Sequence, residues 1–338
     1  MRAPAKILAI LLLVLAPAAA RSAEPAVLAV GLTVSDLDRE TEFFTRVLSF
    51  EPVSTREEVG EAAERLTGVF GAHTRTARLR LGEQEIELTE FLTPRGRAIP
   101  ADSRSNDRWF QHVAIVVSDM DAAYARLREQ HVRFVSSEPQ RLPDWNPNAG
   151  GIRAFYFQDP DGHNLEIIWY PVGKGDPRWQ GPSAGKVFLG IDHTAIVVRD
   201  TAASLAFYRD VLGMHVAGAS ENWGGEQEHL NMVFGAHLRI TALRGSEGPG
   251  VEFLEYVTPE GGRPAPADAA ANDLAHWQTI VRVDELDAVL ERLAAHRDAG
   301  RIASSGAVVL PDGEKAVRGR RAAQVLDPDG HALEWVER

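Results

Sequence analysis

Two similar segments place a carboxylate in a strand that should otherwise be apolar. Residues 158–171 read QDPDGHNLEIIWYP, and residues 326–337 read LDPDGHALEWVE. In both, Asp-Pro-Asp-Gly is typical of a tight turn, because Pro presets φ and Gly accepts a left-handed backbone. The strand after the turn carries Glu166 in the first copy and Glu334 in the second. An ionised carboxylate on a half-buried strand needs a compensating partner, such as a metal ion, unless it lies on a solvated face of the sheet.

The composition is that of a globular protein and excludes several classes of partner. The chain has 338 residues, enough for about two domains of ordinary size. Its 36 basic and 48 acidic residues give a net charge of −12, which argues against nucleic acid or an anionic membrane surface as a partner. There is no cysteine, so disulfides, thiolate ligands and a lipoprotein anchor are excluded.

The N-terminus is typical of a signal peptide. Arg2 and Lys6 supply the positive charges, and residues 7–16 form an apolar run too short to span a bilayer. Small residues at 18–20 are suited to cleavage. We expect cleavage after Ala20 and a periplasmic or secreted protein that no longer contacts the membrane.

The remaining chain repeats itself and indicates two similar halves. The pentapeptide VFGAH occurs at 69–73 and again at 233–237. A stretch rich in Gly, Pro and polar residues separates the halves and is suited to a linker. The predicted organisation is a signal peptide at 1–23, a first domain at 24–172, a linker at 173–186 and a second domain at 187–338.

Each half repeats a smaller unit. Every unit opens with a β-branched strand, a short acidic segment suited to an N-cap, and an amphipathic helix. The helical pattern is clear in the last unit, where apolar residues are spaced i, i+3, i+4, i+7 at Leu286, Val289, Leu290 and Leu293. Three strand-like runs follow each helix. The chain is therefore predicted to contain four βαβββ modules, an α+β fold.

A fourfold βαβββ unit with HVAIVVSDMDAAYARL and DPDGHNLEIIWYP resembles the vicinal oxygen chelate superfamily. That group includes glyoxalases, methylmalonyl-CoA epimerases, extradiol dioxygenases and metal-free bleomycin-resistance proteins. The resemblance covers nearly all of the chain after the N-terminal segment. It implies two glyoxalase/bleomycin-resistance-like domains, each a cupped mixed sheet of two modules around a divalent metal, with ligands from the first and last strands of each module.

Matching those motifs residue by residue gives the ligand positions that the resemblance implies. The first-strand positions in the four modules are Ala29, His112, His193 and Gln278. The last-strand positions are Glu87, Glu166, Glu252 and Glu334.

Pairing of modules within each half would give two different sites. The C-terminal half would combine His193, Glu252, Gln278 and Glu334. The N-terminal half would combine Glu87, His112 and Glu166, since Ala29 cannot bind a metal. We expect one divalent ion per active domain, drawn from Mn, Fe, Co, Ni, Zn and Mg, because all the ligands are nitrogen or oxygen. Glu334 is the first candidate for a catalytic base and Glu252 the second.

Three functions remain open from the sequence. The first is a metal-dependent lyase or isomerase that forms an enediolate or enolate from a small vicinal-oxygen substrate. The second is an extradiol-type dioxygenase, although neither half supplies the required two histidines and one carboxylate. The third is a non-catalytic protein that binds a small molecule. We expect a monomer or homodimer whose halves fold separately if each has its own core.

Overall fold

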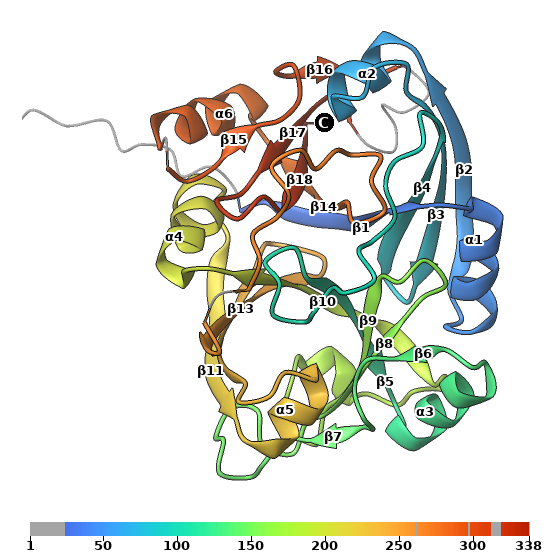
Figure 1. Cartoon of the computed structure of the whole chain (residues 1–338), viewed down its shortest axis with the longest axis vertical. Helices are drawn as coiled ribbons and strands as arrows, with labels where there is room; N and C mark the ends of the chain where they lie inside the picture. The colour runs from blue at the N-terminus through green and yellow to red at the C-terminus, as the bar shows by residue number, and fades with distance from the viewer. Residues whose placement is uncertain (1–23, 261, 297, 312–318, 338) are drawn as a thin grey trace, which may run out of the picture.

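The computed structural model describes residues 24–260, 262–296, 298–311 and 319–337, so the expected signal peptide at 1–23 lies outside the described residues. The four modules appear in chain order (Figure 1). The first contains β1 (Ala26–Val34), α1 (Leu37–Arg46), β2 (Glu51–Val59), α2 (Glu61–Thr67), β3 (His73–Leu81) and β4 (Gln84–Thr93). The second contains β5 (Gln111–Val117), α3 (Met120–Glu129), β6 (Arg133–Phe134), β7 (Gln140–Arg141), β8 (Arg153–Gln158) and β9 (Asn164–Trp169).

A short 3-10 helix, η1 (Pro177–Gln180), leads into the second half. The third module contains β10 (Phe188–Val198), α4 (Thr201–Leu205), the π-helix η2 (Ala206–Val211), β11 (His215–Trp223), α5 (Gly225–Asn231), β12 (His237–Arg244) and β13 (Gly250–Thr258). The fourth contains β14 (Trp277–Val283), α6 (Leu286–Ala295), β15 (Arg301–Ile302), β16 (Val308–Val309), β17 (Arg321–Leu326) and β18 (Ala332–Glu337).

In the first three modules, the aspartate between the first strand and the helix is an N-cap, as the sequence predicts; in the fourth, Glu285 precedes α6 and makes no capping hydrogen bond through its side chain. The Asp36 carboxylate accepts a hydrogen bond from the backbone N–H of Arg39, and Asp200 accepts one from Ala203. Asp119 does the same at the start of α3. Each cap satisfies helix N–H groups that have no partner within the helix, and it fixes where the chain leaves the sheet.

The strands form two nine-stranded sheets, and each sheet takes modules from both halves of the chain. Sheet A has the order β15-β17-β18-β14-β1-β4-β3-β2, with β16 as a ninth strand paired to β17, so it joins the first and fourth modules. Sheet B has the order β11-β12-β13-β10-β5-β9-β8-β6, with β7 as a ninth strand paired to β8, so it joins the second and third. β1 pairs antiparallel with β14, and β10 pairs antiparallel with β5. The mixed α+β architecture is therefore as expected.

The expectation that the two modules of one half share a sheet is wrong. All four modules open with a similar apolar strand, so periodicity alone cannot choose the partner of each opening strand. In the structure β5 pairs with β10, to which the connecting segment leads. The connection between β4 and β5 crosses from one sheet to the other.

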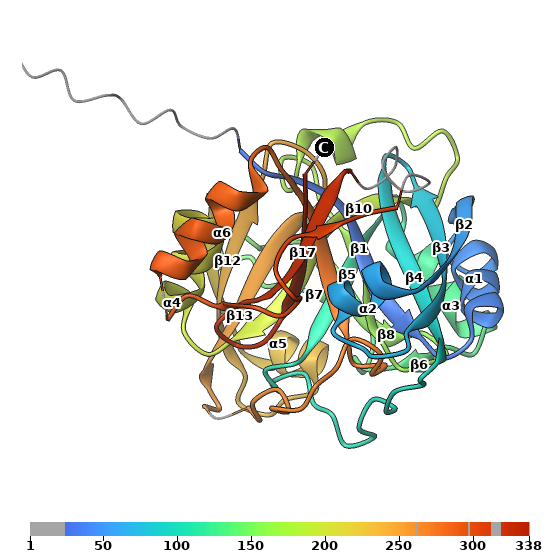
Figure 2. The same cartoon turned by 90° about the horizontal axis from the view of Figure 1, so that it is seen from above.

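The two modules of each half still share a hydrophobic core on the helix side of the sheets. One core contains Phe44, Phe155 and their apolar neighbours from the first two modules. A second core contains Phe207, Trp335 and their neighbours from the last two. Consistent with this, α1 and α3 lie together on one side of the molecule and α4 and α6 on the other (Figures 1 and 2). The two modules of each half are thus joined by packing, and the two halves are joined to each other by strand pairing.

Candidate metal centre

Four of the predicted ligand positions meet in the middle of sheet B. His112 lies on β5, Glu166 on β9, His193 on β10 and Glu252 on β13. Glu166 is paired with Ala114, and Ala195 is paired with both Glu252 and His112. Paired residues, and residues two apart, project to the same face of a sheet. The register therefore directs all four side chains into one cup.

The ligand atoms are close enough to share one ion. His112 Nε2 lies 3.1 Å from Glu166 Oε2, and His193 Nε2 lies 3.7 Å from the same oxygen. His193 Nε2 is also 3.7 Å from Glu252 Oε1. Ligand atoms of His112, Glu166 and His193 all lie within 4.8 Å of one another.

The donor set fits a divalent metal. Both ring nitrogens of His112 and Nε2 of His193 are buried without a hydrogen-bond partner among the described residues. Buried polar atoms are normally paired, so three such nitrogens beside two carboxylates indicate a site that is suited to a cation. Imidazole nitrogens and carboxylate oxygens are ligands of Mn, Fe, Co, Ni and Zn.

The electrostatics of the cup show the same need for positive charge. Burial raises the pKa of Glu252, and the nearby Glu166 carboxylate acts in the same direction. Burial alone would lower the pKa of His193, but Glu252 and Asp192 outweigh it and raise that pKa to about 9. A proton on His193 thus supplies positive charge that a metal ion would provide instead, so metal binding should release protons.

The cup opens into a cavity of about 1040 Å³. Its wall includes Glu166, His193 and Glu252, together with the polar side chains of Asn148, Ser220, Asn222 and Gln227. Part of the connecting segment also lines it, from Gly173 to Arg178. A cavity of this size accommodates a small organic molecule next to the ligand cluster.

The cations in this wall are already engaged. Arg244 Nη2 lies 2.9 Å from Asp192 Oδ2, and Arg178 Nη2 lies 2.9 Å from Asp176 Oδ2. Lys174 Nζ donates to the carbonyl of Pro147. The cavity therefore offers hydrogen-bonding groups and a candidate metal rather than a strongly cationic anion site.

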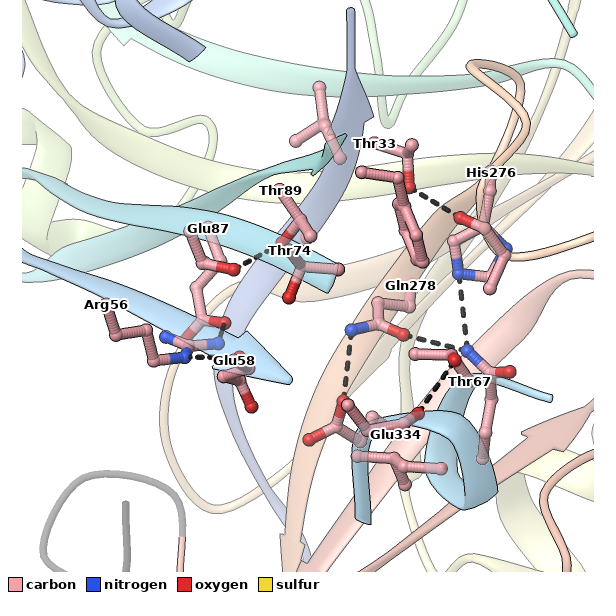
Figure 3. Close-up of a pocket in the computed structure, with 18 residues that line it drawn as sticks. Thr33, Arg56, Glu58, Thr67, Thr74, Glu87, Thr89, His276, Gln278 and Glu334 are labelled. Atoms are coloured by element: carbon pink, nitrogen blue, oxygen red, sulfur yellow. Dashed lines mark hydrogen bonds and ion pairs between the residues drawn. The ribbon is translucent and has the colours of Figure 1, made fainter. Parts of the chain in front are cut away.

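The remaining predicted ligands meet in sheet A, in a different environment (Figure 3). Glu87, Gln278 and Glu334 line a cavity of only about 50 Å³. Arg56 Nη2 lies 2.8 Å from Glu87 Oε2, which puts a guanidinium where a metal charge would be needed. Ala29, the counterpart of His193, is fully buried and has no ligand atom.

Protein side chains fill the coordination sites of this second cup. Gln278 Nε2 donates to Glu334 Oε2 at 3.1 Å, and its Oε1 accepts from Gln324 at 3.0 Å. These residues do not fit a metal as the sheet B set does. The expectation that His193 and Glu252 converge with Gln278 and Glu334 is wrong, because β10 and β14 belong to different sheets.

Sequence reasoning missed the residues that support the cluster. Asp192 accepts a hydrogen bond from His193 Nδ1 at 2.9 Å, and Trp179 Nε1 donates to it at 2.7 Å. A signal was present: only the third module has an acidic residue directly before its ligand position, whereas the second and fourth have Gln111 and Trp277. Arg56 had no such signal, because it lies on β2, away from the ligand motifs.

The comparisons with known proteins agree with this fold. The family model of the Glyoxalase/Bleomycin resistance protein/Dioxygenase superfamily matches residues 26–167 and 190–335. A 2-epi-5-epi-valiolone epimerase of Actinomyces sp is 39% identical over 149 residues, 43% of this chain and 79% of that protein. Glyoxalase I of Saccharomyces cerevisiae is 32% identical over 117 residues, 34% of this chain and 31% of that protein.

Among solved structures, glyoxalase I from Zea mays covers 93% of this chain and 92% of its own, with a TM-score of 0.59 and 17% identity. That likeness concerns the fold alone. Proteins of this superfamily generally use a divalent metal and act on small molecules, and the epimerase and glyoxalase relatives support a metal-dependent enzyme of the isomerase or lyase type. The chain belongs to the Glyoxalase/Bleomycin resistance protein/Dioxygenase superfamily.

Proposed function

We propose that this protein is a metal-dependent epimerase that acts beside the carbonyl group of a small, uncharged, polyhydroxylated ketone. The observation that carries the proposal is the cluster of His112, Glu166, His193 and Glu252 at the base of the sheet B cavity. These four residues would hold the ion. A bound divalent ion supplies Lewis acidity, which polarises substrate oxygens and acidifies the neighbouring C–H bond.

The two carboxylates are arranged for proton transfer. Glu166 and Glu252 occupy equivalent positions of the two modules, on either side of the histidines. Epimerisation removes a proton from one face of a carbon and returns one to the other, which two opposed carboxylates can do. Glu252 is the better candidate for the first base, since its side chain is 21% exposed and Glu166 is 5% exposed.

The substrate class follows from the charges in the cavity wall. Arg244, Arg178 and Lys174 are each engaged by a carboxylate or a carbonyl. A thioester or thiol conjugate with several negative charges would find little compensation there. Hydroxyl groups would instead find the side chains of Asn148 and Asn222, whose amides each keep one group without a hydrogen bond among the described residues. The epimerase relative, which is named for a ketone, supports the same choice.

Metal content and proton exchange test this proposal. We expect about one tightly bound divalent ion per chain, measured by elemental analysis after reconstitution with Mn, Fe, Co, Ni, Zn and Mg. In D₂O, the loaded protein should exchange the proton next to the carbonyl of a cyclic polyhydroxylated ketone. Glu252→Gln should abolish the exchange. Chains that remain without metal in all six reconstitutions would contradict the proposal.

A second function is favoured by one observation. His112, His193 and Glu166 form a set of two histidines and one carboxylate, which neither half of the chain supplies alone. This ligand set is typical of non-haem Fe(II) oxygenases. Glu252 argues against it, because a fourth protein ligand would fill a position that dioxygen chemistry leaves open. Oxygen consumption by the Fe(II)-loaded protein with a catechol would establish the dioxygenase instead.

We also propose that the protein is exported and that its mature form begins at Arg21 or shortly after. The support is the charged N-terminus, the short apolar run and the small residues before that position. Among the described residues, no helix is both long and apolar enough to cross a membrane. N-terminal sequencing of protein from a periplasmic fraction tests the proposal, and an intact Met1 would refute it. Light scattering of the same material tests the expected monomer or homodimer.

A further inference from the structure

A buried aspartate lies directly beside the metal-ligand cluster. Asp192 is 4% exposed, and its Oδ2 accepts a hydrogen bond from His193 Nδ1 at 2.9 Å. Arg244 Nη2 contacts both of its oxygens, at 3.0 and 2.9 Å. Trp179 Nε1 donates to Oδ1 at 2.7 Å, and the Tyr170 hydroxyl donates to Oδ2 at 3.1 Å. Such a fully engaged carboxylate is fixed in position and can orient the imidazole it holds.

An irregularity in β10 brings Asp192 to this place. The pairing with β5 passes from Ile191 to His193, so Asp192 is the extra residue of a β-bulge. In a regular strand, neighbouring side chains point to opposite faces, and a bulge re-aims one of them. The bulge thus allows two adjacent residues to hydrogen-bond through their side chains.

The first module contains the same bulge without the same residues. There the pairing of β1 with β14 passes from Val27 to Ala29, and Leu28 is the extra residue. Leu28 and Ala29 therefore stand where Asp192 and His193 stand in the third module. The acidic residue and the histidine are thus both present in sheet B and both absent at the equivalent positions of sheet A.

Trp179 lies in the connecting segment between the halves, and its surroundings hold it in one orientation. Asp176 caps η1 by accepting from the backbone N–H of Arg178, and the N–H of Trp179 bonds to the Asp176 carbonyl at 3.0 Å. Gly190 leaves room for the indole ring, because a Cβ there would lie 2.7 Å from Trp179 Cη2. Arg178 stacks on the ring, 5.2 Å from its centroid. The indole is held tightly enough to direct its N–H at Asp192.

We propose that Trp179 and Asp192 are positioning residues of the metal site, and that the connecting segment is therefore a working part of the site rather than a passive tether. This inference rests on the proposed metal-dependent function. Asp192 holds Nδ1–H of His193 and so leaves Nε2 as the ligand atom, facing Glu166 and Glu252. Trp179, in a different part of the chain, keeps the Asp192 carboxylate oriented.

Three variants of the full-length chain test the proposal. Asp192→Asn weakens the hydrogen bond to His193, and Trp179→Phe removes the indole N–H while keeping an aromatic ring. Trp109→Phe is the matched control, because Trp109 Nε1 also donates a hydrogen bond, to Ser103 Oγ at 3.2 Å, in a loop away from the sheet B cavity. Co(II) is the probe, since its visible absorption reports ligand geometry and its affinity can be measured by chelator competition.

The expected losses differ between the variants. Asp192→Asn should weaken Co(II) binding by about 10- to 100-fold and alter the visible spectrum, as loss of an orienting partner does in other metal sites. Trp179→Phe should give a smaller loss with a spectral change of the same kind. Trp109→Phe should match the wild type in both affinity and spectrum. Thermal unfolding of the metal-free proteins separates these effects from a general loss of stability.

Several results would overturn the inference. If Trp179→Phe binds Co(II) with the affinity and spectrum of Trp109→Phe, Trp179 has no positioning role. If Asp192→Asn is folded and also matches the wild type, the role of Asp192 is refuted. A wild-type protein that binds no Co(II) and no other divalent ion would instead refute the proposed function, and the inference would fall with it.

Discussion

Single side chains give the two cups different chemistry. His193 in sheet B is replaced by Ala29 at the equivalent position of sheet A, so one imidazole ligand is lost. In sheet A, Arg56 lies 2.8 Å from Glu87 and supplies positive charge from the protein itself. A guanidinium cannot polarise a substrate as a metal can, but it does allow a carboxylate to remain buried. The two cups have equivalent backbone arrangements, so their side chains decide which of them is suited to bind an ion.

Two glutamates at equivalent positions provide a direct test at this scale. Glu166→Ala should lower divalent-metal affinity by at least about tenfold, because it removes an anionic ligand 3.1 Å from His112 and 3.7 Å from His193. Glu334→Ala should leave metal affinity unchanged, since Glu334 lies in the other sheet. Isothermal titration with Zn(II) or Mn(II) measures both. A loss of affinity in Glu334→Ala alone would mean that sheet A holds the metal.

The turn before β9 does more than reverse the chain. His163 is fully buried, and its Nδ1 lies 2.7 Å from Asp159 Oδ2. Its Nε2 lies 2.8 Å from the carbonyl oxygen of Leu274 and 3.1 Å from that of Thr33. Both ring nitrogens face acceptors, which only the doubly protonated imidazolium can satisfy. The turn of the second module is thereby bound to segments of the first and fourth.

This histidine should make stability depend on pH. Burial alone would lower the pKa of His163, but Asp159, Glu40 and Asp161 outweigh it and raise the pKa from 6.5 to about 9. The stabilisation is therefore complete below pH 6.5 and is lost as the pH rises through 9. Glu40, whose pKa is raised mainly by burial, to about 9, acts in the same direction from a lower starting pH.

We expect the free energy of unfolding of the wild type to fall by about 1–3 kcal/mol between pH 6.5 and 9. His163→Gln should show a shallower decline over the same range, because one of the groups that lose a proton in this range is removed. Urea denaturation at several pH values measures the slopes. An equal slope in the variant would show that His163 is not protonated in the folded protein.

The two long loops that precede β5 and β14 are joined by two equivalent Arg–Asp ion pairs, which together are called the clasp. Arg97 reaches across to Asp273, with Nε 3.0 Å from Oδ1, and Arg263 reaches back to Asp107, with Nε 2.9 Å from Oδ1. Burial alone would raise the pKa of both aspartates, but these contacts outweigh it and lower the pKa of each. The loops thus connect one half of the chain to the other outside the sheets.

The symmetry of this clasp predicts matched effects. Arg97→Ala and Arg263→Ala should each lower the midpoint of thermal unfolding by a few degrees, because each leaves a buried aspartate without its guanidinium. Arg46→Ala is the control, since that side chain is 78% exposed and its ion pair with Glu42 lies at the surface. Calorimetry measures all three. If Arg46→Ala lowers the midpoint of thermal unfolding as much as the two clasp variants do, loss of the Arg–Asp ion pairs does not explain their effect.

At the scale of the whole molecule, packing and strand pairing join the modules in different combinations. Within each half, the helices pack around a common core. The sheets instead combine modules from both halves, so the candidate metal cluster takes two residues from each half. A half separated from the other would keep its core but expose the edges of two central strands. Exposed edges of this kind favour association with another chain.

This arrangement predicts how separated halves behave. Residues 24–186, which keep the connecting segment with Trp179, and residues 187–338, produced separately, should self-associate or aggregate instead of forming stable monomers, and neither should bind metal tightly. Mixed together, they should form a one-to-one complex that binds about one ion. Size-exclusion chromatography with elemental analysis measures both. A monomeric 187–338 fragment that binds metal alone would contradict the pairing of β10 with β5.

The sequence alone determined the modules and most of the candidate ligands. The periodicity of 286–293, the capping aspartates and the repeated DPDGH turn are local features, so they predict the βαβββ unit without reference to the rest of the chain. The ligand positions His112, Glu166, His193 and Glu252 are those that the resemblance to the vicinal oxygen chelate superfamily implies for these repeats. Ala29 likewise indicates a deficient cup by its residue type, since a methyl side chain has no ligand atom.

The tertiary structure decided which ligands meet. The four modules present similar opening strands, so local pattern cannot distinguish pairing within a half from pairing between halves. That choice depends on the packing and connections of the whole chain. The roles of Arg56, Asp192 and Trp179 were equally beyond the sequence, because each acts on a ligand through a contact that exists only after the sheets have formed.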